Sequence, residues 1–120
     1  QSKFFFPEEF AKANPGVLQE LFKSFWDNAP KLEPYLYHVI ARNQHETGEL
    51  LHKITTPTLC IVGSEDKVDA DTGNHVITTE HQRDNIKGAE YKVIDGCGHG
   101  FFWQKPEETN RIIRDWLDRH

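Results

Sequence analysis

An apolar run in the middle of the chain reads Pro57-Thr58-Leu59-Cys60-Ile61-Val62-Gly63-Ser64-Glu65-Asp66. Its continuous apolar part, bounded by a proline and a glycine, is typical of a strand buried on both faces of a parallel sheet. A second run, Tyr91-Lys92-Val93-Ile94, stops at Asp95-Gly96 and predicts the next strand. Enough residues separate the two runs for a crossover that contains a helix, which we expect between Asp71 and Ile86. The sequence therefore predicts an α/β fold with parallel strands.

Each predicted strand ends beside a side chain of a type that acts in catalysis. Asp66 closes the first run, and His99 lies in the loop Gly96-Cys97-Gly98-His99-Gly100 after the second. An imidazole can move protons near neutral pH, and a carboxylate that accepts its other ring N–H fixes its tautomer. We expect the flanking glycines to leave the backbone free to project the ring of His99. The alternatives are a histidine in a tight glycine turn and an aspartate that caps the following helix.

These motifs, taken in this order, resemble the C-terminal part of an α/β-hydrolase. In that family a strand of the form P-T-L-x-x-x-G-x-x-D carries the triad acid, and a later G-x-G-H loop carries the histidine. Here the two patterns match Pro57 to Asp66 and Gly96 to His99, and a helix expected from Pro106 follows them. The resemblance implies that Asp66 orients His99 as a general base for hydrolysis of an ester, lactone or related bond. It implies neither a metal nor an organic cofactor.

The first half of the chain reads as helical. Asn14-Pro15 predicts a helix start with a capping side chain, and the apolar spacing that follows predicts a helix ending near Asn28. A second helix is expected from Lys31, with an interruption at Gly48. The closing segment from Pro106 predicts a helix with one apolar face, made of Ile112, Ile113, Trp116 and Leu117.

The resemblance also implies how the chain is organised. Residues 1–48 match a helical cap or lid-like segment with its return helix, and residues 49–120 match the C-terminal α/β part. In an intact hydrolase the aromatic start of the chain would lie over the active site. We therefore expect a small apolar ester-like substrate, bordered by Phe5, Phe6, Phe101 and Phe102.

One member of a triad is missing from the sequence. No G-x-S-x-G, G-x-D-x-G or G-x-C-x-G motif occurs in the 120 residues, and the oxyanion-hole segment of the family is also missing. Ser64 and Cys97 each lie two residues from the supposed partner on the same loop, so we interpret them as residues that fill a loop or a core gap. The chain alone is not expected to perform acyl transfer. The missing nucleophile could be Ser, Asp or Cys.

Two other clusters contain residue types that bind metals. They are the histidines His38, His45 and His52 with Glu49, and the aspartates Asp66, Asp69 and Asp71. The histidines repeat every seven residues, which on a helix separates successive members by about 10 Å, too far for one ion. A site formed by His45, Glu49 and His52 would need a helix that continues through Gly48. The aspartates lack the glycine and glutamate of an EF-hand. We interpret both clusters as solvated surface and predict no metal site.

Composition limits the classes of protein to which the chain can belong. With 120 residues and 37% hydrophobic content, it suffices for one small domain. Its 19 acidic and 14 basic residues are scattered, which argues against nucleic acid or anionic lipid as a partner. No apolar stretch is long enough to span a membrane. Cys60 and Cys97 do not form a C-x-x-C pair, which argues against a disulfide scaffold and fits a reducing, cytoplasmic setting.

A sheet of two parallel strands cannot cover its own edges and faces. Three explanations stay open: the rest of a hydrolase is supplied separately, two copies of the chain pair edge to edge, or a longer product was proteolysed. The chain contains no Met, which suggests a beginning cut from a longer protein. We expect the missing N-terminal half or a second copy as a partner. The alternative function is a non-catalytic interaction module that keeps the hydrolase scaffold.

Overall fold

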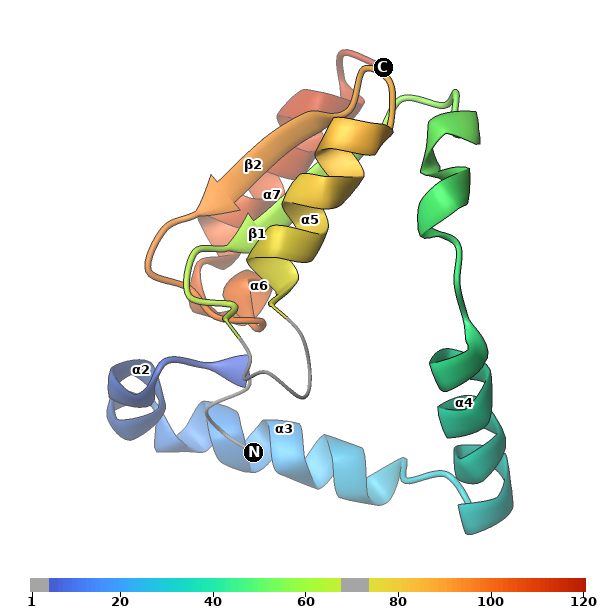
Figure 1. The fold of residues 1–120 in the computed structure, drawn as a ribbon. Helices are drawn as coiled ribbons and strands as arrows, with labels where there is room; N and C mark the ends of the chain where they lie inside the picture. The colour runs from blue at the N-terminus through green and yellow to red at the C-terminus, as the bar shows by residue number, and fades with distance from the viewer. Residues whose placement is uncertain (1–4, 68–73) are drawn as a thin grey trace.

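The computed structural model describes residues 5–67 and 74–120. Figure 1 shows the course of the chain. The first half contains α2 (Glu8–Ala13), α3 (Pro15–Asp27), α4 (Leu32–Gln44) and the 3-10 helix η1 (Gly48–Lys53). The second half contains β1 (Leu59–Gly63), α5 (His75–Asn85), β2 (Glu90–Ile94), α6 (Phe101–Gln104) and α7 (Pro106–Leu117).

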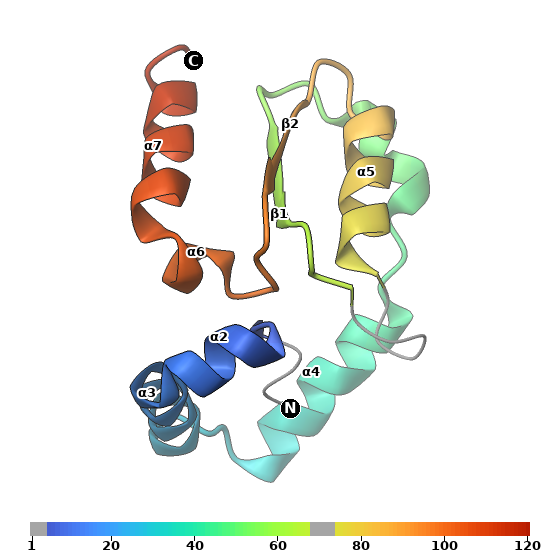
Figure 2. The same ribbon diagram turned by 90° about the vertical axis from the view of Figure 1, so that its left-hand side faces the viewer.

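The two strands form a parallel sheet, in which Leu59 pairs with Glu90 and Gly63 pairs with Ile94. Helix α5 lies over one face of this sheet and α7 over the other, as the edge-on view in Figure 2 shows. The predicted α/β fold with parallel strands is therefore confirmed. Because neighbouring parallel strands end at the same edge, the chain leaves β1 and β2 at adjacent points.

The helices of the first half agree with the apolar spacing in the sequence. Helix α3 begins at Pro15. The helical structure is interrupted between the end of α4 at Gln44 and the start of η1 at Gly48. The predicted capping role of Asn14 is wrong: its side chain donates a hydrogen bond to the carbonyl of Phe10, at 3.0 Å, and accepts none from α3. This residue therefore closes α2, a helix that the sequence analysis did not predict, as it did not predict α6.

The buried core is small and draws on both strands, the loop after β2, helix α3, the end of α5 and the N-terminal aromatic segment. Val62, Ile94 and Cys97 are almost completely buried, and Phe6 is fully buried. The ring of Phe6 packs against those of Phe10 and Trp103, with centroids 5.0 and 6.3 Å apart. The N-terminal segment therefore packs against helix α6.

Many large apolar side chains outside this core face solvent. Trp26 on α3 is 84% exposed, and Leu32 and Tyr37 on α4 are 71% and 63% exposed. Helix α4 stands apart from the sheet in both views (Figures 1 and 2). On α7, half of the predicted apolar face is uncovered, because Ile113 and Leu117 are exposed. The described part of the chain buries much less apolar surface than its helices offer.

Cys60 and Cys97 are both free and buried. Among the described residues, we find no helix with the length and apolar character needed to cross a membrane.

Candidate functional site: a carboxylate between two histidines

The loops that follow β1 and β2 are held together by a set of short hydrogen bonds. The amide of Ser64 donates to the carbonyl of Ile94 at 3.0 Å, and that of Glu65 donates to Cys97 at 2.8 Å. The hydroxyl of Ser64 accepts from the amide of Gly96 at 2.8 Å. These contacts fix the two loops to each other just before Asp66 and His99, so the two side chains face each other.

Three glycines allow close packing at the site: Gly63 between the two loops, and Gly98 and Gly100 against the N-terminal segment. A Cβ on Gly63 would lie closer than 3.0 Å to the carbonyl oxygens of Cys97 and Gly98, and one on Gly100 would lie equally close to the ring of Phe6. A Cβ on Gly98 would meet the carbonyl oxygen of Phe5 at 2.9 Å. The expectation of backbone freedom around His99 is wrong, because neither flanking glycine has a positive φ. Both flanking glycines are needed for close packing instead.

Asp66 and His99 form a hydrogen bond in which His99 Nδ1 lies 3.0 Å from Asp66 Oδ2. The side chain of Asp66 is 3% exposed and that of His99 is 38% exposed. Since a carboxylate only accepts, the ring must donate its Nδ1–H, and the lone pair of the neutral ring is then on Nε2. This geometry lets a buried acid fix the tautomer of a more accessible histidine.

A second histidine, which the sequence analysis did not identify, binds the other oxygen of the same carboxylate. His75 Nδ1 lies 2.9 Å from Asp66 Oδ1, and the centroids of the His75 and His99 rings are 4.8 Å apart. A buried carboxylate is costly unless both of its oxygens are hydrogen-bonded, and the two imidazoles meet that need. His75 therefore helps to hold Asp66 in one orientation.

Helix α5 places His75 at this position. The side chain of Asn74 accepts hydrogen bonds from the amides of Val76 and Ile77, at 3.1 and 3.3 Å, and so caps the helix. Asn74 also forms an isolated antiparallel bridge with Lys67, the residue after Asp66. The first turn of α5 is thereby brought beside Asp66. A capping Asn before His75 is the only signal in the sequence, and it does not reveal which carboxylate the histidine meets.

The four aromatic residues expected at a substrate site differ in accessibility. Phe5 lies edge-on to His99, with ring centroids 5.7 Å apart. Phe6 is fully buried beneath this region, so in the described structure it packs in the core rather than on an accessible surface. Phe101 and Phe102 follow His99 on α6, with their ring centroids 5.4 Å apart. Phe102 is 45% exposed.

Ser64 and Cys97 fill structural positions, as the sequence analysis interpreted them. The hydroxyl of Ser64 is engaged with Gly96 and lies 3.2 Å from Glu65 Oε1. Cys97 is 1% exposed, and burial raises the pKa of its thiol, which is the opposite of what an activated nucleophile requires.

Among the described residues, the histidines of the first half belong to no group of three potential metal ligands. Helix α4 ends before His45, whose Nε2 lies 3.1 Å from the hydroxyl of Thr47. In the parts of the chain that the structure describes, the one group of three potential metal ligands is Asp66, His75 and His99, whose donor atoms lie within 4.8 Å of one another. The sequence places Asp66 as a potential metal ligand only beside Asp69 and Asp71, so it does not bring Asp66, His75 and His99 together. Asp69 and Asp71 lie outside the described residues.

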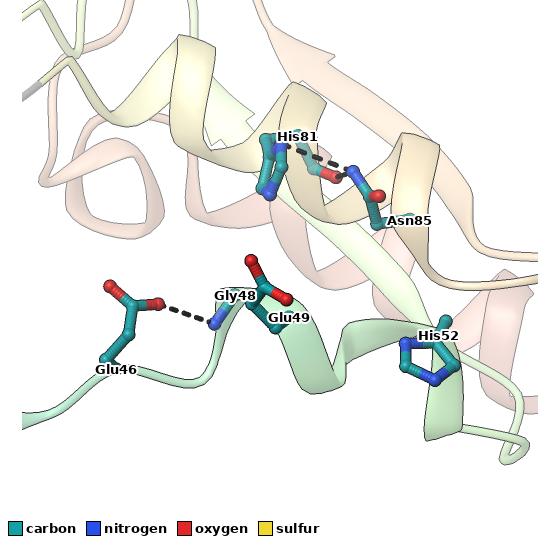
Figure 3. A pocket seen from close by; sticks show the side chains of 6 residues that line it. All are labelled: Glu46, Gly48, Glu49, His52, His81 and Asn85. Atoms are coloured by element: carbon teal, nitrogen blue, oxygen red, sulfur yellow. Dashed lines mark hydrogen bonds between the residues drawn. The ribbon is translucent and has the colours of Figure 1, made fainter.

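A separate polar hollow of about 610 Å³ lies between η1 and the C-terminal half of α5 (Figure 3). His81 and Asn85 line it from α5, and His52 lines it from η1, together with Glu46, Gly48 and Glu49. Since His81 is six residues beyond His75, a helical rise of about 1.5 Å per residue places it about 9 Å along α5 from His75. The hollow is thus distinct from the Asp66 cluster.

Comparison with known proteins shows which enzymes the sequence is similar to. No family model matches the chain. It is 32% identical over 78 residues to a proline iminopeptidase of Lactobacillus crispatus, covering 65% of this chain and 25% of that protein. It is 26% identical over 76 residues to the monoacylglycerol lipase abhd6-A of Xenopus laevis, covering 63% of this chain and 21% of that protein. The chain thus spans about a quarter of the length of these relatives.

A solved structure decides the fold. The chain superimposes on Est816, an N-acyl homoserine lactone degrading enzyme, with a TM-score of 0.68 and 23% sequence identity. The match covers 94% of this chain and 43% of that one. The chain has a partial α/β-hydrolase fold. In this partial α/β-hydrolase fold, each of the two described strands has one edge without a neighbouring strand.

Proposed function

We propose that this chain supplies the acid and the histidine of a nucleophile-His-Asp triad that hydrolyses an ester, lactone or related bond. Asp66 is the acid, His99 is the general base, and the nucleophile belongs to polypeptide outside these residues. The observation that carries the proposal is the hydrogen bond between His99 and the buried carboxylate of Asp66. The names of the matched hydrolases support the same class of chemistry.

In the proposed mechanism, each proton passes through His99. Asp66 holds Nδ1–H, so Nε2 can take the proton of the nucleophile as it attacks the carbonyl carbon. The imidazolium that forms is stabilised by the adjacent carboxylate, and it then returns the proton to the leaving group. Water attacks the acyl intermediate in the second half of the reaction, again with His99 as base. His75 acts as a positioning residue, since it holds the second oxygen of Asp66.

The substrate proposed for the intact enzyme is small, apolar and ester-like. Phe5 stands edge-on to His99, and Phe102 is partly exposed on the helix that follows the histidine loop. Phe101 and Phe102, with Phe5, would give the acyl side of a cleft an aromatic wall. The lid-like role proposed for residues 1–48 fits the fastening of their aromatic start to the His99 loop, where the amide of Gly100 donates to the carbonyl of Phe5 at 2.7 Å.

The test compares the chain alone with a longer protein, called the supplemented protein, in which any polypeptide encoded directly upstream is expressed together with the chain. Alone, the chain should hydrolyse an activated ester no faster than its His99→Ala variant, because it has no nucleophile. With a preceding segment that contains G-x-S-x-G or an equivalent, activity should appear, and His99→Ala or Asp66→Asn should reduce kcat about ten-thousand-fold. His81→Ala, on the far half of α5, is the matched control and should retain activity.

An activity of the supplemented protein that survives His99→Ala would contradict the proposal. Activity of the chain alone, lost on His99→Ala, would contradict the claim that it lacks a nucleophile.

A second function is favoured by the exposed apolar surface of α3 and α4, where Trp26 and Leu32 face solvent. In this alternative the chain is a non-catalytic interaction module, and the surface and sheet edges bind a second copy or another polypeptide. Sedimentation analysis of the chain distinguishes a dimer from a monomer. A stable dimer without activity in the supplemented protein would favour this alternative.

A further inference from the structure

We infer that the cluster of Asp66, His75 and His99 binds one zinc ion or a similar divalent transition metal. The binding does not depend on the proposed hydrolytic role. The three side chains are one carboxylate and two imidazoles, a set that suits zinc, cobalt or nickel. Magnesium and calcium prefer oxygen ligands only, so they are not expected to bind.

The distances between the donor atoms suit such an ion after small ring movements. Nδ1 of His75 and of His99 lie 2.9 and 3.0 Å from the two oxygens of Asp66, and one donor atom from each residue lies within 4.8 Å of the others. In a tetrahedral site with bonds of about 2.0–2.1 Å, neighbouring donor atoms are about 3.3 Å apart. The three ligands are therefore already close to one another, and each donor atom needs to move by no more than about 1 Å.

The surroundings of the cluster also favour a bound cation. Asp66 is buried and held between two loops, while the side chains of His75 and His99 are 32% and 38% exposed. Solvent can thus supply the fourth ligand from the histidine side. Coordination uses the Nδ1 lone pairs, so each neutral ring moves its proton from Nδ1 to Nε2, and the ion replaces the two N–H···O contacts.

One consequence rests on the proposed function. His99 cannot both donate Nδ1–H to Asp66 and coordinate an ion through Nδ1, so zinc would inhibit the intact enzyme. Zinc binding by the chain itself is independent of that activity, so the two proposals can fail separately.

The test is calorimetric titration of the 120-residue chain with ZnCl₂. We expect one ion per chain, and a cobalt-loaded sample should show the visible absorption of a tetrahedral centre. His75→Gln keeps a hydrogen-bond donor for Asp66 but loses the imidazole, and it should weaken binding by at least about 100-fold, the upper end of what loss of a supporting contact costs. His81→Gln is the matched control on the same helix and should leave the affinity unchanged.

A measurement on the unaltered chain covers the case in which a variant does not fold. Adding zinc should shift the imidazole nitrogen resonances of His75 and His99, and not those of the other five histidines. Equal zinc affinity of the His75→Gln and unaltered chains would overturn the inference. So would loss of binding in His81→Gln, since it would place the ion at the polar hollow between η1 and α5 instead.

Discussion

Gly63→Ala should destabilise the chain and separate the two halves of the candidate site. The added Cβ would lie closer than 3.0 Å to the carbonyl oxygens of Cys97 and Gly98, and both obstacles are backbone atoms. They cannot rotate away as a side chain can, so the two loops must part. The hydrogen bond from the amide of Glu65 to Cys97, at 2.8 Å, would be stretched in the process.

The expected loss is at the upper end of overpacking costs, about 3 kcal/mol in the free energy of unfolding. With an unfolding entropy of about 2.1 cal/mol/K per residue, the melting temperature of the 120-residue chain should fall by about 12 °C. Thermal unfolding followed by circular dichroism measures this shift. The hydrogen-bonded Nδ1 proton of His99, followed by NMR, reports whether the contact with Asp66 survives.

Gly16→Ala is the matched control for this experiment. A Cβ at Gly16, in α3, meets no atom within 4 Å, so alanine should stabilise the chain by up to about 1 kcal/mol through its higher helix propensity. A melting temperature of Gly63→Ala at or above that of the unaltered chain would refute the reasoning, because it would mean that the loops are not in contact at this point.

Three further predictions concern the core, the helix cap and the thiols. Phe6→Ala should lower the free energy of unfolding by about 3–5 kcal/mol in urea, since the ring is fully buried, whereas Trp26→Ala, at a residue 84% exposed, should change it by no more than about 0.5 kcal/mol. Asn74→Ala should cost about 1 kcal/mol of thermal stability by removing the cap of α5, and Asn74→Ser should restore most of it. Burial raises the pKa of the thiols of Cys60 and Cys97, so at pH 8 both should react with a thiol reagent much more slowly in the folded chain than in urea.

The raised thiol pKa values also set the sign of a pH dependence. Above about pH 8.5, the ordinary thiol pKa, the unfolded chain loses thiol protons that the folded chain keeps. The contribution of the thiols to stability is therefore complete below that pH and is lost as the pH rises through the folded-state values. Urea titrations at pH 7.5 and 9.5 should show the decline, and Cys60→Ala with Cys97→Ala should reduce it. Equal decline with and without the thiols would assign it to other groups.

The strands and most helices could be predicted because their signals are local. The run from Thr58 to Val62 is continuous and ends at Gly63, and the spacing of apolar residues marks α3 and α7. The short helices α2 and α6 were missed because each has too few residues for a periodic pattern. The capping role of Asn14 was assigned wrongly because two helices meet there, and the side chain serves the end of the first.

The sequence by itself determined that the two strands run parallel and that Asp66 and His99 follow them. It could do so because strand ends are local and parallel neighbours end at one edge. Only the tertiary structure decided that His75 shares Asp66 with His99, and that Gly98 and Gly100 are required by close contact rather than by backbone freedom. His75 is nine residues from Asp66 and His99 is 33, and these partners are set by how the loops and helix α5 pack, which no local pattern encodes.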